Sequence, residues 1–90
     1  MSKDTRIVMY STETCPYCMA ARMLFTRKGL DFQDVPVAAD REKRAEMERL
    51  SGRRTVPQIF IDGEPVGGFD DVDALDKSGR LDGMLAEPVE

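Results

Sequence analysis

A helix-forming segment between two short apolar segments restricts the fold of this chain more than any other feature of its sequence. Residues 5–10 (TRIVMY) are β-branched and apolar and predict a buried strand. Apolar residues then recur at helical spacing from Pro16 until Gly29 ends the pattern. Residues 31–37 (DFQDVPV) alternate in polarity and predict a second strand, which Pro36 places at a sheet edge. Two strands joined through a helix form a parallel pair.

The middle of the chain predicts a second helix followed by a hairpin. Asp40 is expected to cap a helix over residues 41–51, which a Ser-Gly pair ends. The inner face of this helix is expected to consist of Ala45, Met47 and Leu50. Residues 57–68 (PQIFIDGEPVGG) predict two antiparallel strands around an Asp-Gly turn at residues 62–63.

The remainder of the chain predicts helices. One is expected over residues 70–77, capped by Asp70 or Asp71, and a short last helix is expected around residues 82–86. The element order is therefore β-α-β-α-β-β-α. It predicts an α/β fold with a four-stranded mixed sheet flanked by three to four helices, and residues 1–90 are expected to form a single domain.

The charge distribution argues for small anionic partners rather than nucleic acid. The net charge is −4, yet residues 41–54 carry six basic and three acidic side chains, whereas residues 62–90 carry nine acidic and two basic ones. A single basic stretch without interleaved aromatic residues is not typical of a nucleic-acid surface. No apolar run approaches the length of a membrane span or a secretory signal. We therefore expect a cytoplasmic protein that does not bind membranes.

The two cysteines of the chain, Cys15 and Cys18, admit three readings: a structural disulfide, part of a metal site, or a redox pair. Helical spacing of three residues places their Cα atoms about 5–6 Å apart, within the range of a disulfide. A permanent disulfide is unusual in the reducing cytosol. A zinc site needs four ligands, and the chain has no histidine, so a metal would require a dimer or external thiols.

The position of the pair at the start of a helix favours redox exchange. The first backbone N–H groups of a helix lack carbonyl partners, and they favour a thiolate at Cys15. A stabilised thiolate is also expelled more readily from a mixed disulfide. Cys18 lies one turn further into the helix and is the better candidate for a buried partner.

Three motifs in this order resemble the dithiol glutaredoxins. They are Cys15-Pro16-Tyr17-Cys18 after the first strand, TVPQIFIDG at residues 55–63 and GGFDD at residues 67–71, and the resemblance covers nearly the whole chain. It implies the thioredoxin fold, which agrees with the predicted element order. It also implies reduction of protein disulfides and glutathione mixed disulfides, with glutathione as co-substrate and no tightly bound cofactor or metal.

The resemblance assigns roles to individual residues. Cys15 corresponds to the nucleophile and Cys18 to the resolving thiol. The implied glutathione-binding residues are Tyr17, Arg44, Thr55, Val56, Pro57, Gly68, Phe69, Asp70 and Asp71. Arg44 is expected to reach the glycyl carboxylate, and Arg41, Arg49, Arg53 and Arg54 are alternatives for this role. The Val56–Pro57 bond is expected to be cis, and the backbone of Val56 is expected to pair with glutathione as an added strand would. The helix after Gly68 is expected to receive the γ-glutamyl carboxylate.

One departure and two alternatives accompany this assignment. Many family members carry a lysine where this chain has Thr12, so the Cys15 thiolate is expected to be less stabilised unless an arginine supplies the charge. One alternative is a glutathione-ligated iron–sulfur carrier, which Pro16 disfavours; the other is an electron donor coupled to thioredoxin reductase. The expected partners are glutathione and disulfide-containing or glutathionylated proteins, including ribonucleotide reductase, and the expected state is a monomer.

Overall fold

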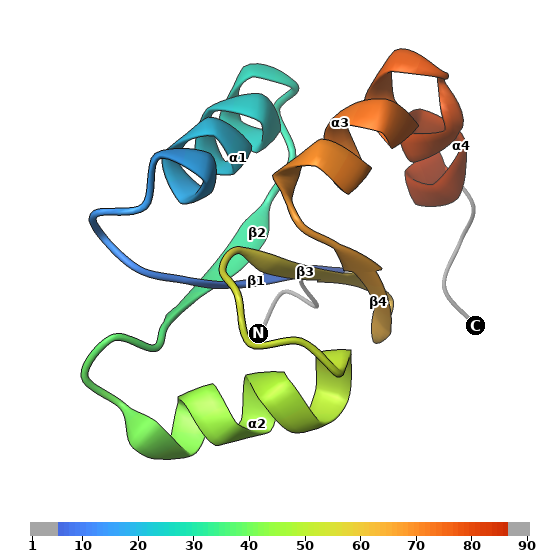
Figure 1. The fold of residues 1–90 in the computed structure, drawn as a ribbon. Coiled ribbons are helices and arrows are strands. Elements are labelled where there is room, and N and C mark those ends of the chain that lie inside the picture. The colour runs from blue at the N-terminus through green and yellow to red at the C-terminus, as the bar shows by residue number, and fades with distance from the viewer. Residues whose placement is uncertain (1–5, 87–90) are drawn as a thin grey trace, which may run out of the picture.

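The protein forms a four-stranded sheet with helices on both faces (Figure 1), as seen in a computed structural model that describes residues 6–86. In chain order the elements are β1 (Ile7–Ser11), α1 (Pro16–Arg27), β2 (Phe32–Pro36), α2 (Arg41–Ser51), β3 (Gln58–Ile61), β4 (Glu64–Gly67), α3 (Phe69–Lys77) and α4 (Arg80–Ala86). The predicted order is confirmed, with four helices. The start of the first predicted strand, Thr5, lies outside the described residues. Within residues 6–86, no helix is both long and apolar enough to cross a bilayer.

The sheet has the strand order β2-β1-β3-β4. The predicted parallel pair of β1 with β2 and the predicted antiparallel hairpin of β3 with β4 are both confirmed. β2 lies at an edge of the sheet. Pro36 is tolerated there, because no strand on the outer side needs a backbone N–H group from this position. The hairpin turns at Asp62 and Gly63 with φ angles of 54° and 84°, the left-handed values that an Asp-Gly pair adopts at low cost.

Alternation along the central strands separates two apolar layers. On one face, Ile7 and Met9 of β1 pack with α1, α3 and α4 in a cluster of buried residues: Ile7, Met9, Ala21, Leu24, Phe25, Ile59, Ile61, Val72 and Leu81. On the other face, Tyr10 packs with α2 in a smaller cluster: Tyr10, Val37, Met47 and Phe60. Figure 1 shows α1, α3 and α4 above the sheet and α2 below it.

Two details of the helices differ from the sequence prediction. Asp40 caps α2 as predicted, accepting a hydrogen bond from Lys43 N at 3.0 Å, but Ala45 and Leu50 are exposed and only Met47 of the predicted inner face is buried. The apolar layer beneath α2 is small, so a single side chain of this helix, Met47, is enough to cover it. The helix predicted from residue 70 begins at Phe69, with Gly68 as its N-cap.

The larger apolar layer should dominate stability. Phe25 is fully buried and its ring centroid lies 5.3 Å from that of Phe32, so Phe25→Ala should lower the free energy of unfolding by about 3–5 kcal/mol. Met23 on the same helix is 64% exposed, and Met23→Ala should change it by less than about 0.5 kcal/mol. Urea unfolding followed by circular dichroism measures both. Equal losses would contradict the assignment of this layer as the core.

Candidate active site

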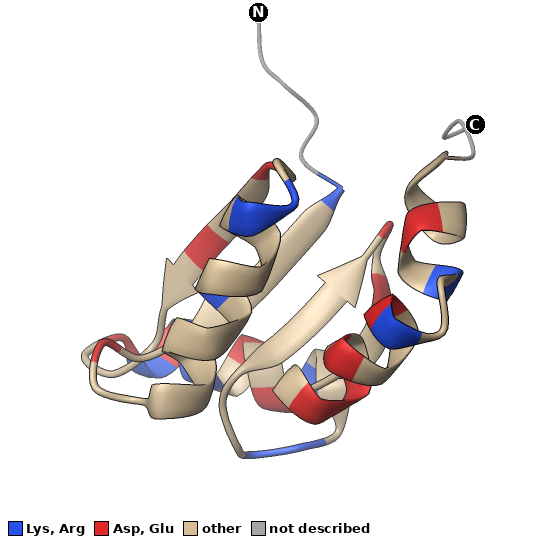
Figure 2. Cartoon of the chain, turned by 90° about the horizontal axis from the view of Figure 1, so that it is seen from above, with Lys and Arg blue, Asp and Glu red and all other residues tan. Residues whose placement is uncertain are grey.

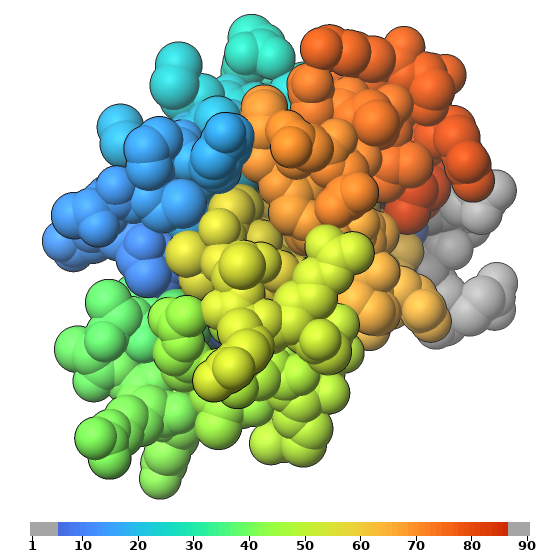
Figure 3. Space-filling model, viewed as in Figure 1, coloured from blue at the N-terminus to red at the C-terminus, as the bar shows by residue number. Residues whose placement is uncertain are grey.

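Strand register brings three distant segments to one end of the sheet. Tyr10 at the carboxyl end of β1 pairs with Gln58 at the amino end of β3, and Ile59 pairs with Gly67 at the carboxyl end of β4. The loop before α1, the loop before β3 and the turn before α3 therefore adjoin one another. Figure 3 shows these segments, in blue, yellow and orange, meeting on one face of the molecule.

Cys15 lies where these segments meet and is partly exposed. It is the N-cap of α1, and its Sγ accepts a hydrogen bond from Cys18 N at 3.4 Å. The same sulfur lies 3.7 Å from the carbonyl oxygen of Val56. The Cys15 sulfur thus lies between a backbone N–H group at the helix start and a backbone carbonyl of the loop before β3.

Cys18 is a different kind of thiol, although it lies one turn away. It is fully buried, and burial raises its pKa to about 11; neighbouring Cys15 adds to this effect. A hydrogen bond from the Thr12 backbone and the positive charge of Arg22 lower the pKa of Cys18 and so offset part of this increase. Both cysteines are free thiols. The pair therefore combines an accessible sulfur with a protected one.

The loop before β3 is held by a residue that the sequence reasoning did not single out. The Val56–Pro57 bond is cis, as expected. Gln58 is buried, and its Nε2 donates to the carbonyl oxygen of Thr55 at 2.9 Å and to Thr55 Oγ1 at 3.1 Å. The one available signal was a polar residue at the start of an apolar strand. Gln58 thus fixes the backbone that faces Cys15.

The two glycines before α3 allow a close approach of backbone and carboxylate. Gly67 has a φ of 112°, and a Cβ there would lie 2.2 Å from a carboxylate oxygen of Asp71. That carboxylate accepts a hydrogen bond from Gly68 N at 3.0 Å and thereby caps the helix. Asp71 is therefore a capping residue, while the next N–H groups of α3 face outward.

A pocket beside Cys15 is lined by most of the predicted glutathione-binding residues. It is lined by Tyr17, Arg53, Thr55, Val56, Pro57, Gln58, Gly68, Phe69 and Asp70. Seven of these were predicted from the family resemblance. The rings of Tyr17 and Phe69 have centroids 6.5 Å apart and bridge the start of α1 to the start of α3. Arg53 was predicted only as an alternative to Arg44, and Gln58 was not predicted.

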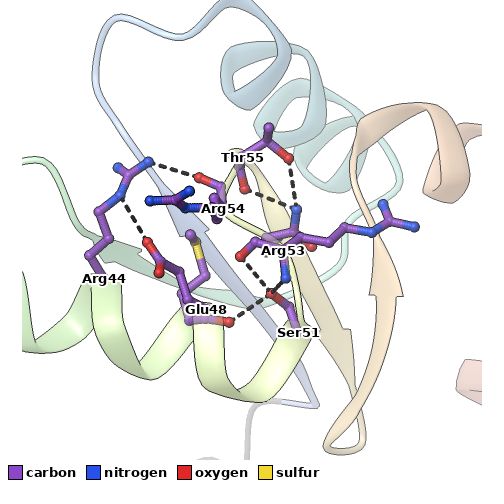
Figure 4. A network of polar contacts seen from close by, with 8 residues as sticks. Arg44, Glu48, Ser51, Arg53, Arg54 and Thr55 are labelled. Carbon is purple, nitrogen blue, oxygen red and sulfur yellow. Dashed lines mark hydrogen bonds and ion pairs between the residues drawn. The ribbon is translucent and has the colours of Figure 1, made fainter.

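The two arginines nearest this region take different roles (Figure 4). Arg44 does not line the pocket: its Nη2 donates to the carbonyl oxygen of Arg54 at 2.8 Å, and its Nε lies 3.7 Å from a Glu48 carboxylate oxygen. Arg53 lines the pocket and extends away from Arg44, toward Asp71 at 3.6 Å. The sequence alone could not show which arginine borders the pocket, because the position of each side chain relative to α3 depends on the path of the loop after α2.

The pocket lining carries both signs of charge. α3 carries four aspartates and one lysine, and Figure 2 shows several red segments along it; Asp70 of this helix lines the pocket. Arg53 brings a cation to the same pocket, 3.6 Å from the Asp71 carboxylate. The pocket therefore presents both signs of charge to a small zwitterionic ligand. Among residues 6–86, no group of three or more histidine, cysteine or acidic side chains is placed to hold a metal.

The glutaredoxin family profile matches residues 7–66, which include the cysteine pair and the loop before β3. The chain belongs to the glutaredoxin family. It is 51% identical to glutaredoxin 3 of Escherichia coli K12 over 79 residues, which are 88% of this chain and 95% of that protein. It is 48% identical to a glutaredoxin of Pseudomonas aeruginosa over 80 residues, which are 89% and 95% of the two chains.

Solved glutaredoxins confirm the thioredoxin fold. The glutaredoxin of Brucella melitensis superposes with a TM-score of 0.78 at 42% identity, covering 94% of this chain and 95% of that one. A buckwheat glutaredoxin–glutathione complex superposes with a TM-score of 0.82 at 31% identity, covering 90% and 76%. This glutaredoxin is thus a glutathione-dependent disulfide oxidoreductase with a dithiol pair.

Selective alkylation should separate the two thiols. At pH 7 iodoacetamide should modify Cys15 well before Cys18, because Cys18 is buried and its pKa of about 11 keeps it protonated. Raising the pH toward 11 should ionise Cys18 and narrow the difference. Quenched samples analysed by peptide mass spectrometry give both rates. Equal modification at pH 7 would contradict the buried, protonated state of Cys18.

Proposed function

We propose that this glutaredoxin reduces glutathione mixed disulfides and protein disulfides with Cys15 as nucleophile and Cys18 as resolving thiol. The observation that carries the proposal is the partly exposed Cys15 sulfur, 3.4 Å from Cys18 N and 3.7 Å from Val56 O, at the edge of a pocket. Residues 1–90 act as one domain and a monomer in the cytoplasm, where glutathione maintains the dithiol.

On a mixed disulfide the Cys15 thiolate attacks the glutathione sulfur. The substrate leaves as a thiolate that takes a proton from water, and Cys15 carries the glutathione. A second glutathione thiolate then attacks the bound glutathione sulfur and expels Cys15 as a thiolate, forming glutathione disulfide. On a protein disulfide, the Cys15 thiolate attacks one sulfur and expels the other as a thiolate. Cys18 then attacks the Cys15 sulfur, releases the reduced protein and forms a Cys15–Cys18 disulfide, which two glutathione molecules reduce while forming glutathione disulfide. Ribonucleotide reductase is a candidate for such a protein substrate.

Glutathione binding would use the pocket walls. The backbone of Val56, next to the cis Pro57, pairs with the cysteinyl unit as an added strand. The start of α3 at Gly68 and Phe69 receives the γ-glutamyl carboxylate. Of the two aspartates predicted for its ammonium group, Asp70 lines the pocket and meets it, while Asp71 caps the helix. The similar fold of a buckwheat glutaredoxin bound to glutathione supports this placement.

Serine substitutions distinguish the roles of the two sulfurs. Cys15→Ser should lose reduction of a glutathione mixed disulfide by at least about a hundredfold, since the nucleophile is absent. Cys18→Ser should keep that activity and lose reduction of a protein disulfide. The assay couples glutathione disulfide formation to glutathione reductase. Turnover of the mixed disulfide by Cys15→Ser would refute the proposed nucleophile.

Arg53 and Arg44 form a matched pair for testing the glycyl end of glutathione. Because Arg53 lines the pocket and is about half exposed, Arg53→Gln should raise the KM for glutathione roughly two- to fivefold. Arg44→Gln should change it less, because Arg44 bonds the Arg54 backbone instead. A larger effect at Arg44 would restore the assignment made from the family resemblance.

A further inference from the structure

A charged cluster lies behind the cysteine pair, outside the pocket. Arg22 of α1 donates from Nε to Asp34 of β2 at 2.6 Å, and from Nη2 to Ser11 Oγ at 2.9 Å. The same Nη2 lies 3.3 Å from the carbonyl oxygen of Thr12, and Ser11 also donates to Asp34. Ser11 is buried, and the Arg22 side chain is 27% exposed. The guanidinium is therefore fixed by partners on two separate segments, β2 and the end of β1 with the residue that follows it.

This fixed cation lies next to Cys18. Arg22 is four residues after Cys18 in α1, so the two side chains project from the same face of the helix, one turn apart. Thr12, whose carbonyl accepts from Arg22, also donates a backbone hydrogen bond to the Cys18 thiol. Arg22 and Cys18 thus share a neighbour in space as well as a helix face.

The position matters because the resolving thiol is buried. Removal from water disfavours the thiolate of Cys18, yet that thiolate must attack the disulfide on Cys15. A nearby cation compensates for part of the lost hydration. In agreement, the charge of Arg22 lowers the pKa of Cys18, and both cysteines raise that of Arg22. For Arg22, the hydrogen bond to Asp34 is the largest cause.

We propose that Arg22 is a positioning residue of the resolving step: its guanidinium, held by Asp34, Ser11 and Thr12, stabilises the negative charge on Cys18 as this sulfur attacks Cys15. The inference rests on the proposed roles of the two cysteines. Asp34 anchors the guanidinium and also opposes its charge. The two members of the ion pair should therefore affect the step in opposite directions.

The step is ring closure in the glutathionylated protein. The Cys18 thiolate attacks Cys15 Sγ, the bond between Cys15 and glutathione breaks, and glutathione leaves as a thiolate that takes up the proton lost by Cys18 through water. If loss of the Arg22 charge lowers the thiolate fraction about tenfold at pH 7, the more basic sulfur recovers about threefold in nucleophilicity. Ring closure should then slow about threefold.

The experiment follows this closure directly. Cys15 is glutathionylated with glutathione disulfide at acidic pH, the protein is shifted to pH 7, and acid-quenched samples are analysed by mass spectrometry for loss of the bound glutathione. Arg22→Gln should slow closure about threefold or more, and Arg22→Lys should restore most of the rate because it keeps the charge. Closure by Arg22→Gln at the rate of the unaltered chain would overturn the proposal.

Two substitutions separate charge from architecture. Asp34→Asn removes the opposing charge and keeps one oxygen to accept from Arg22 Nε, while its NH2 group replaces the oxygen that accepts from Ser11. With the guanidinium still held, closure should be as fast as before or faster. If Asp34→Asn and Arg22→Gln slowed ring closure equally, the cluster would have only a structural role, and the proposal would be overturned. Arg27→Gln, which removes a cation from the exposed end of α1, should leave closure unchanged.

A last comparison identifies the sulfur on which the charge acts. In the Cys18→Ser background, where no ring can close, Arg22→Gln should slow the reduction of a mixed disulfide less than it slows closure. Equal slowing there would assign the charge to Cys15 and overturn the proposal. If Cys15→Ser retains mixed-disulfide turnover, the proposed function itself fails, an outcome distinct from every result for Arg22.

Discussion

The antiparallel pairing of β1 with β3 is the constraint on which the rest of the site depends. Because Tyr10 pairs with Gln58, the chain leaves β1 toward Cys15 at the same end of the sheet at which it enters β3 from Val56 and Pro57. The hairpin then brings the last residue of β4 back to that end of the sheet, so that Gly67 and Gly68 lie at the start of α3. A shift of one residue in this register would exchange the two faces of β3, moving Ile59 and Ile61 to the smaller layer and Phe60 to the larger one.

The chemistry follows from placing two identical thiols in unequal surroundings on one helix. Cys15 caps α1 at the protein surface, where an N–H group and solvent reach it, whereas Cys18 is fully buried one turn further into the helix. The same burial that protects Cys18 from other reagents also makes its thiolate costly. Charged and polar neighbours of Cys18 must then offset that cost, and the Arg22 cluster is suitably placed.

Local patterns predicted most of the fold and part of the site. The β-branched apolar run in β1 and the Asp-Gly turn at residues 62–63 are short-range signals, and both elements formed where they were expected. The inner face of α2 was predicted poorly, since a helix with a single fully buried residue, Met47, has little periodic signal. Gln58 was missed and Arg53 was only one of four alternatives to Arg44, because polar residues beside a motif acquire their roles from the folded positions of their neighbours.

The sequence by itself determined the element order, the redox motif at Cys15 and Cys18 and the family, since each depends on residues close together in the chain. The tertiary structure decided which arginine borders the pocket, which aspartate caps α3 and what lies behind Cys18. Those outcomes depend on where side chains from α1, β2 and the loop after α2 meet. Arg22 and Asp34 are twelve residues apart and lie on different elements, so no local pattern joins them. The physical reason is that hydrogen bonds and charges act over a few ångströms of space, whatever the separation along the chain.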